Sequence, residues 1–300
     1  ITRSATTHNW FQQSLYILSL TIYYIFFFIK ASLNSHKKQR PREIGDQVME
    51  NEREKLIYLA KLACQTERYD DMIKSMRKVC EYDIELSKEE IDLLTTGYKK
   101  VMETKRDSLK VISTIGEVED LKGNEQKVKL IKGKQEMVKD EFSNVCNDIL
   151  FLIDAHLIPS TTNVESTIFF LRIKGDYYRY MAAFGSDAER KETADNSLEA
   201  YKVAMEMAEK SLAPTNLVRL GLALNFSVFS YDILNSTERA SKLAKQAYDE
   251  AITELDGLDD KQKYKEKKVI IDMLKYNLSV WTSYHDHDEH SGIPKNKKDE

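Results

Sequence analysis

The sequence predicts an all-α protein, and three observations support this fold class. The 300 residues include only ten glycines and four prolines, too few for the many tight turns of an all-β protein. Long segments rich in Lys, Glu, Leu and Ala recur along the chain, as they do in amphipathic helices. Hydrophobic residues make up 42% of the sequence, enough to bury a sizeable core in one large or two small domains.

Charge and cysteine content exclude several classes of function. The net charge is -4, and acidic and basic residues are interspersed, so the composition does not indicate a nucleic-acid surface. The three cysteines, Cys64, Cys80 and Cys146, are well separated and form no CxxC pair. They predict neither a disulfide framework nor a zinc site, which favours a reducing compartment.

A hydrophobic segment lies near the start of the sequence. Residues 4–29 carry no formal charge, and the twenty residues from Trp10 onward are just long enough for one membrane span. Only Arg3 precedes this segment, whereas five basic residues follow it. An anchored chain would therefore keep its C-terminal part in the cytosol. The five basic residues are Lys30, Lys37, Lys38, Arg40 and Arg42.

Three interpretations of this segment remain open: a signal anchor, a cleaved signal peptide, and an extension that the mature protein lacks. No small-x-small cleavage site follows the apolar run, which weighs against secretion. Asn225 also lies in an Asn-Phe-Ser sequon, which a lumenal location would expose to glycosylation. We expect a cytoplasmic protein; the alternative is membrane attachment through residues 10–29, with the helical domain facing the cytosol.

The rest of the sequence predicts a helical domain between two polar segments. Residues 35–50 contain Pro41 and Gly45 and predict a linker. We therefore expect a hydrophobic extension and linker over 1–50, a helical domain over 51–284 and a disordered polar tail over 285–300. Although the tail contains His285, His287 and His290, no second ligand cluster accompanies them, so no metal site is predicted.

Helix starts and stops divide the domain into nine helices with short connections, which favour antiparallel neighbours. Three capping boxes mark helix starts: Ser87 with Glu90, Thr162 with Glu165, and Ser186 with Glu189. The predicted helices cover about 53–66, 69–82, 88–118, 132–157, 164–185, 190–212, 218–235, 238–256 and 266–284.

One pattern of basic residues indicates an anion site. In LRIKGDYYRYM (Leu171–Met181), Arg172 and Arg179 are seven residues apart and share one stripe of a helix, with Tyr180 beside the second arginine. Lys99 and Arg106 repeat the seven-residue spacing in an earlier predicted helix. Stripes of this kind need negatively charged partners.

The segments KGDYYRY (174–180) and RLGLALNFSVF (219–229) resemble the 14-3-3 family, the dimeric helical adaptors that bind phosphoserine and phosphothreonine peptides. The similarity runs from about Arg53 to Ser283. It implies nine antiparallel helices around a concave amphipathic groove, and phosphorylated client proteins as partners. It also implies that the ligand phosphate is held by Lys99, Arg106, Arg179 and Tyr180.

The resemblance further implies a peptide groove whose walls mix apolar, amide and charged side chains. At three positions the sequence keeps the charge that is usual in the family but changes the length and hydrogen-bond geometry of the side chain. Arg172 replaces a lysine, Lys110 an arginine and Asp232 a glutamate. We therefore expect altered sequence preference rather than lost phosphate binding. The implied groove residues are Arg172, Leu224, Asn225, Val228, Asp232, Ile270, Met273, Asn277 and Trp281.

Dimer contacts are implied less completely. Arg68, Asp71 and Glu141 match family residues that form salt bridges between subunits, whereas Lys55 stands where an acid is usual and Met137 where a lysine is usual. We expect a homodimer or a heterodimer with a paralogue, with a monomer as the remaining alternative.

Two other classes of function compete with the adaptor. The sequence contains no GxxxxGK[ST], HExxH or GxSxG motif and no phosphatase loop, so we expect a non-enzymatic protein without a cofactor. The other rival is a divergent helical scaffold that binds unphosphorylated peptides or helices. The four predicted phosphate-binding residues argue for the adaptor.

Overall fold

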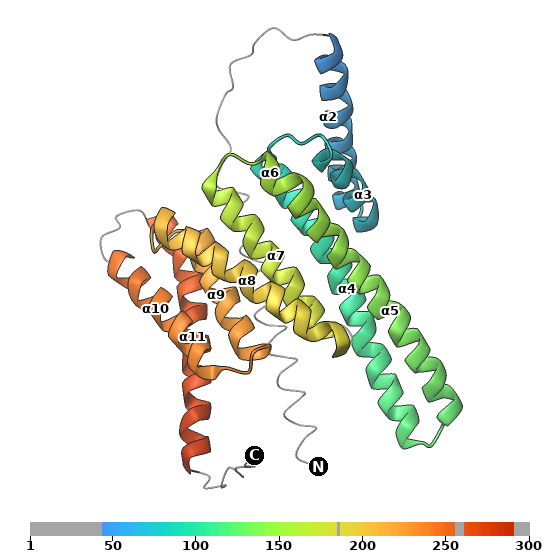
Figure 1. The fold of residues 1–300 in the computed structure, drawn as a ribbon. Coiled ribbons are helices and arrows are strands. Elements are labelled where there is room, and N and C mark those ends of the chain that lie inside the picture. The colour runs from blue at the N-terminus through green and yellow to red at the C-terminus, as the bar shows by residue number, and fades with distance from the viewer. Residues whose placement is uncertain (1–43, 185–186, 256–260, 291–300) are drawn as a thin grey trace. The chain divides into compact units, whose positions relative to one another are not determined.

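The computed structural model describes residues 44–184, 187–255 and 261–290, and every regular element in these ranges is helical (Figure 1). This confirms the predicted fold class. The elements are α2 (Ile44–Gln65), α3 (Tyr69–Cys80), α4 (Lys88–Leu121), α5 (Glu125–Leu152), a π-helical turn (Ile153–Leu157), α6 (Ile158–Ser160), α7 (Val164–Phe184), α8 (Asp187–Ser211), α9 (Leu217–Asp232), α10 (Thr237–Leu255) and α11 (Lys261–His290).

The described helices group into two compact units, with the boundary inside α8 after Ser197. The N-terminal unit contains α2 to α7 and the first part of α8, and the C-terminal unit contains the rest of α8 and α9 to α11. The helical domain predicted over 51–284 thus consists of parts of two units.

In the N-terminal unit, α4 and α5 form a long antiparallel pair (Figure 1). The core beneath them is apolar, with Tyr98 and Phe142 among its largest fully buried side chains. Gly97 lets α4 approach α3, because a Cβ at this position would lie 3.3 Å from Met72 and from Ile73. The close packing of α3, α4 and α5 holds α4, which carries part of the predicted phosphate site.

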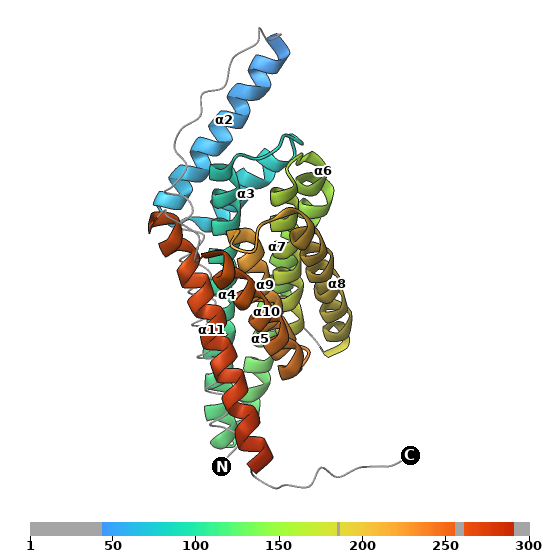
Figure 2. The ribbon, with the colours of Figure 1, turned by 90° about the vertical axis from the view of Figure 1, so that its left-hand side faces the viewer.

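In the C-terminal unit, α9 packs against both α10 and α11 (Figure 2). Most residues of α9 are apolar, and ten of its sixteen residues are buried. Asn216 caps its start, because the Asn216 side-chain oxygen accepts hydrogen bonds from the backbone N–H groups of Val218, at 2.8 Å, and Arg219, at 3.3 Å. Tyr201 on α8 stacks on Phe226 of α9, with 5.3 Å between ring centroids.

Several predicted helix boundaries were wrong. α2 begins at Ile44, so the last part of the predicted linker is helical; no proline follows Pro41 there to prevent it. α5 begins at Glu125 rather than near 132, because a tight turn with Gly123 at φ +72° connects it to α4. α11 continues to His290, beyond the predicted end at 284, since no glycine or proline interrupts the sequence before Gly292.

One of the three predicted capping boxes is confirmed. The Ser87 backbone N–H donates to Glu90 at 2.7 Å, and the Ser87 hydroxyl accepts from the Glu90 backbone N–H at 3.4 Å. The second prediction was one residue off: Asn163 caps α7 through the Glu165 N–H, at 2.9 Å, while the Thr162 hydroxyl donates to Glu85. The third, at Ser186, lies outside the described residues.

The hydrophobic segment and the linker up to residue 43 also lie outside the described residues. None of the helices that the structure does describe combines the length and apolar character needed to cross a bilayer.

Candidate functional site

Lys99 and Arg106 project from the middle of α4, two turns apart. The Lys99 side chain is 19% exposed, and its ammonium lies 3.7 Å from the Glu103 carboxylate. Burial lowers the Lys99 pKa to about 8; Glu103 opposes this shift, whereas the positive charges of Lys100 and Arg106 add to it. Lys99 is thus a partly desolvated cation in a locally positive environment.

Arg106 is also largely withdrawn from water, with 15% of its side chain exposed. Its Nε atom is buried and has no hydrogen-bond partner among the described residues. The Arg106 Nε atom lies 4.0 Å from a carboxylate oxygen of Asp107, too far for a hydrogen bond. A buried guanidinium donor without an acceptor is costly, and an anionic ligand would satisfy it.

α7 supplies Arg179 and Tyr180. Arg179 is buried, and its guanidinium carbon lies 4.7 Å from the centroid of the Tyr180 ring. Tyr180 in turn meets Tyr177 edge to face, with ring centroids 5.7 Å apart. The aromatic packing fixes the Tyr180 ring and places the Arg179 guanidinium against it.

The structure brings the four predicted phosphate-site residues together. Burial raises the pKa of the Tyr180 hydroxyl to about 12, and the charges of Arg179 and Arg106 partly oppose this shift. The charge of Arg106 also lowers the pKa of Lys99, where it adds to the effect of burial. Two residues of α4 and two of α7, separated by more than seventy positions in the sequence, therefore share one electrostatic environment. We call Lys99, Arg106, Arg179 and Tyr180 the basic cluster.

Two carboxylates beside this cluster were not identified from the sequence. Glu103 accepts a hydrogen bond from Lys100 at 3.1 Å and pairs with Lys99. Asp176 pairs with Arg172 at 3.4 Å, and both side chains are only 6% exposed. The i,i+4 spacing of Lys99 with Glu103 and of Arg172 with Asp176 was the signal that could have revealed them.

Arg172 is therefore a buried ion-pair partner in the N-terminal unit. Its guanidinium carbon also lies 4.9 Å from the Phe169 ring centroid. The charge of Arg172 lowers the pKa of Tyr180, although less than that of Arg179 does. The Asp176 carboxylate raises the same pKa by more than Arg172 lowers it, so this ion pair adds no net positive charge beside the basic cluster.

The other predicted groove residues lie in the C-terminal unit, and all but Asp232 are buried. The Trp281 ring stacks on Tyr231 with 5.1 Å between centroids. Asn277 is 3% exposed, and its side-chain amide nitrogen has no hydrogen-bond partner among the described residues. That amide is a donor available to a ligand. The remaining buried groove residues are Leu224, Asn225, Val228, Ile270 and Met273.

The predicted dimer residues are paired within the chain. Arg68 Nε donates to Asp71 at 2.6 Å, and Lys74 lies 3.7 Å from the same carboxylate. Glu141 forms an ion pair with Lys105 of α4. Arg68 holds the pKa of Asp71 below its usual value, and Lys105 does the same for Glu141.

Comparison with known proteins agrees with this architecture. A family model described as 14-3-3 protein matches residues 59–282. The chain is 57% identical over 235 residues to the 14-3-3-like protein GF14 epsilon of Arabidopsis thaliana, covering 78% of this chain and 92% of that protein. It is 52% identical over 235 residues to 14-3-3 protein 7 of Solanum lycopersicum, covering 78% and 93%. The chain therefore belongs to the 14-3-3 family of adaptor proteins, which bind client proteins and form dimers.

Proposed function

We propose that this protein is a non-enzymatic adaptor that binds phosphoserine and phosphothreonine segments of client proteins. The observation that carries the proposal is the basic cluster, in which α4 and α7 place three cationic side chains and a phenol in one environment. A phosphoserine carries a charge of about -1.5 to -2 near neutral pH, so it complements this cluster. The buried Nε of Arg106 would gain the acceptor that the described residues do not provide.

Selectivity for the phosphorylated segment follows from the kind of contacts. Each charge-assisted hydrogen bond contributes roughly 1.5 to 3 kcal/mol to the binding free energy. Two or three such bonds are therefore enough for the protein to bind a phosphopeptide much more tightly than the same peptide without phosphate. We identify no nucleophile and general base paired beside the cluster among the described residues, which fits binding without hydrolysis. A captured segment would be hidden from enzymes that act on it, or held close to a second bound segment through a dimer.

Fluorescence anisotropy tests the proposal. The chain is titrated against a phosphoserine peptide with an upstream arginine and against the same peptide without phosphate. We expect selective binding of the phosphopeptide, and Arg179→Ala should weaken it by at least tenfold because a charge-assisted contact is lost. The matched control is Arg190→Ala, which removes an exposed arginine on α8.

The alternative function, a scaffold for unphosphorylated peptides or helices, predicts a different result. Equal binding of the two peptides, with helicity retained by circular dichroism, would favour the scaffold and reject phosphate recognition. Loss of binding in both arginine variants alike would indicate general electrostatic attraction rather than a phosphate site.

We further propose that the helical units work on the cytoplasmic side. Asn225, the sequon residue, is buried within α9 at 5% exposure, so a glycan there would prevent the helix from packing. All three cysteines are free, as expected of a protein in a reducing compartment. Expression in plant cells should therefore yield protein whose mobility is unchanged by glycosidase; a shift would contradict this assignment.

A further inference from the structure

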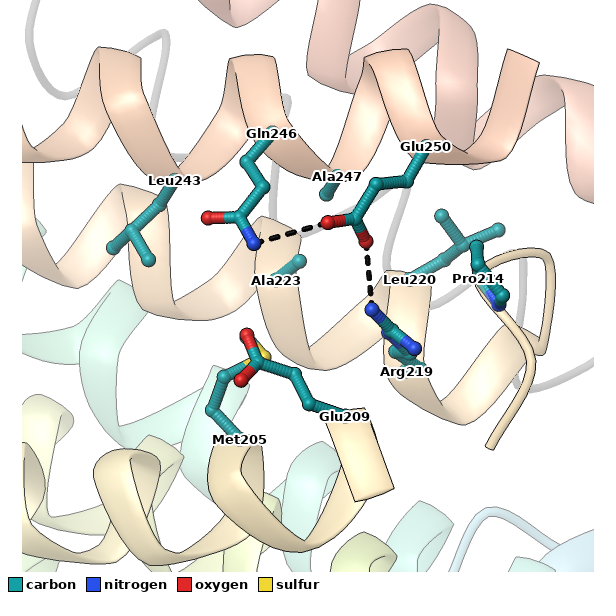
Figure 3. A pocket seen from close by; sticks show the side chains of 10 residues that line it. All are labelled: Met205, Glu209, Pro214, Arg219, Leu220, Ala223, Leu243, Gln246, Ala247 and Glu250. Carbon is teal, nitrogen blue, oxygen red and sulfur yellow. Dashed lines mark hydrogen bonds and ion pairs between the residues drawn. The ribbon is translucent and has the colours of Figure 1, made fainter. Parts of the chain in front are cut away.

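A small pocket in the C-terminal unit is lined by none of the predicted phosphate-site, groove or dimer residues. It encloses about 20 Å³ between the end of α8, the following loop, α9 and α10. Its floor is apolar, formed by Leu220, Ala223, Leu243 and Ala247 (Figure 3). The two alanines leave the space that larger side chains would fill. This volume is little more than a water molecule or one terminal group of a side chain needs.

One wall is held rigidly by a hydrogen-bond network. Arg219 donates through Nη1 to the Leu212 carbonyl at 2.8 Å and through Nη2 to Glu250 at 2.6 Å. The Gln246 side-chain amide donates to the other Glu250 oxygen at 3.0 Å (Figure 3). The Arg219 side chain is 13% exposed. The charge of Glu250 is thus already balanced, while its oxygens and the Gln246 carbonyl can still accept hydrogen bonds.

The opposite wall carries an unbalanced charge. Met205 and Glu209 come from successive turns of α8, and the Glu209 carboxylate lies at the pocket with no counterion among the described residues (Figure 3). Arg219 balances Glu250, so the lining as a whole has one uncompensated negative charge. The pocket therefore combines an apolar floor, several oxygen acceptors and a single net negative charge.

We propose that this pocket binds the ammonium end of a lysine side chain from a partner protein. Only the end of the side chain would enter the pocket: the ammonium would lie over the apolar floor and reach Glu209 and the acceptors on the Glu250 wall, while most of the methylene stem would stay outside. The small volume favours a compact ammonium over the broad, planar guanidinium of arginine. All of the lining residues belong to the C-terminal unit, whereas the basic cluster belongs to the N-terminal unit. The inference is therefore independent of phosphate recognition.

Methyl NMR of the whole chain tests this proposal, because the floor and Met205 supply reporter methyl groups. The probe is Nα-acetyl-lysine N-methylamide. The norleucine analogue keeps the stem without the charge, and the arginine analogue carries the larger cation. We expect the lysine probe to shift the methyl signals of Leu220, Leu243 and Met205 saturably, with a millimolar Kd, and the other two probes to bind more weakly.

Variants then separate the pocket from the general surface charge. Glu209→Gln should weaken binding of the lysine probe about threefold, as expected for one solvent-accessible ion pair. Glu206→Gln, which removes an exposed carboxylate of α8 that does not line the pocket, should leave it unchanged. The proposal is overturned if the probe gives no saturable shift at tens of millimolar, if norleucine or arginine binds equally well, or if Glu209→Gln has no effect.

Discussion

At the scale of single residues, Glu103 is the group that most directly opposes an anionic ligand. Its carboxylate pairs with Lys99 at 3.7 Å and accepts from Lys100 at 3.1 Å, so a bound phosphate must compete with it for cations. Glu103→Gln should therefore tighten phosphopeptide binding about two- to fivefold at low salt, the range of a partly exposed ion pair. Anisotropy titrations provide the measurement.

Glu117→Gln is the control for this substitution, because Glu117 is an exposed carboxylate further along α4. Equal tightening in both variants would mean that only the overall charge matters. Weaker binding in Glu103→Gln would show that Glu103 positions Lys99 rather than competing with the ligand.

Lys99 should make phosphopeptide binding depend on pH. Burial lowers its pKa to about 8 in the free protein, and a bound phosphate must raise that pKa again because it favours the charged form. Binding therefore takes up a proton once the pH exceeds about 8, and affinity should fall there by up to about tenfold per pH unit. Below pH 8 Lys99 is already charged, and the phosphate is dianionic above about pH 7.

Titrations between pH 7 and 9.5 measure this effect. Lys99→Arg should remove the decline, since an arginine stays protonated throughout that range. A wild-type affinity that is flat to pH 9.5, or a decline that persists in Lys99→Arg, would show that Lys99 is not the titrating group.

At the scale of the helices, the turn between α4 and α5 depends on one glycine. Gly123 has φ +72°, a conformation that costs a residue with a side chain about 1 to 2 kcal/mol. Gly123→Ala should lower the free energy of unfolding by about that amount, measured with urea. Gly133 lies inside α5, where an added Cβ meets nothing within 4 Å.

Gly133→Ala should therefore raise the free energy of unfolding by about 0.5 to 1 kcal/mol, because alanine has the higher helix propensity. We therefore expect the same substitution, glycine to alanine, to change the free energy of unfolding in opposite directions at two positions ten residues apart. If both variants are destabilised alike, side-chain contacts rather than backbone conformation would decide stability at the turn.

The sequence predicted which segments are helical better than where they end. Amphipathic periodicity extends over many residues, so a local irregularity does not hide it. Nine long helices were predicted, and nine are present in the described ranges. Boundaries depend on single side chains. Asn163 caps α7 in place of Thr162, because the Thr162 hydroxyl is engaged by Glu85, and this tertiary contact has no signal in the local sequence.

The basic cluster was predicted from spacing and from the family resemblance, not from packing. Seven-residue spacing could place Lys99 with Arg106, and Arg172 with Arg179, on common stripes, but it could not show that the two stripes meet. The sequence also could not show how deeply these side chains are buried. Arg172 and Asp176 form a buried ion pair because of the way α7 packs in its unit.

At the scale of the whole molecule, the exposed apolar residues of the N-terminal unit indicate a dimer. Large hydrophobic side chains are 41% to 75% exposed on three helices, and burial in a dimer would remove them from water. Arg68, Asp71 and Glu141, which the sequence predicts to form ion pairs between subunits, have partners within the chain. We infer a dimer held mainly by apolar contacts, formed by Tyr58, Leu59 and Leu62 of α2, Val111, Ile115 and Val118 of α4, and Leu130 and Met137 of α5.

Ile115→Asp should therefore convert the dimer to a monomer, because it would bury an unpaired carboxylate in the interface. Light scattering after size exclusion gives the mass directly. Val164→Asp at the start of α7 changes a valine of similar exposure, 44% against 49% for Ile115, and should leave the mass unchanged.

If apolar contacts dominate, raising the salt concentration to 1 M should not dissociate the wild type, since screening weakens ion pairs but not apolar burial. Dissociation by salt, with Ile115→Asp still dimeric, would instead place the interface on charged residues.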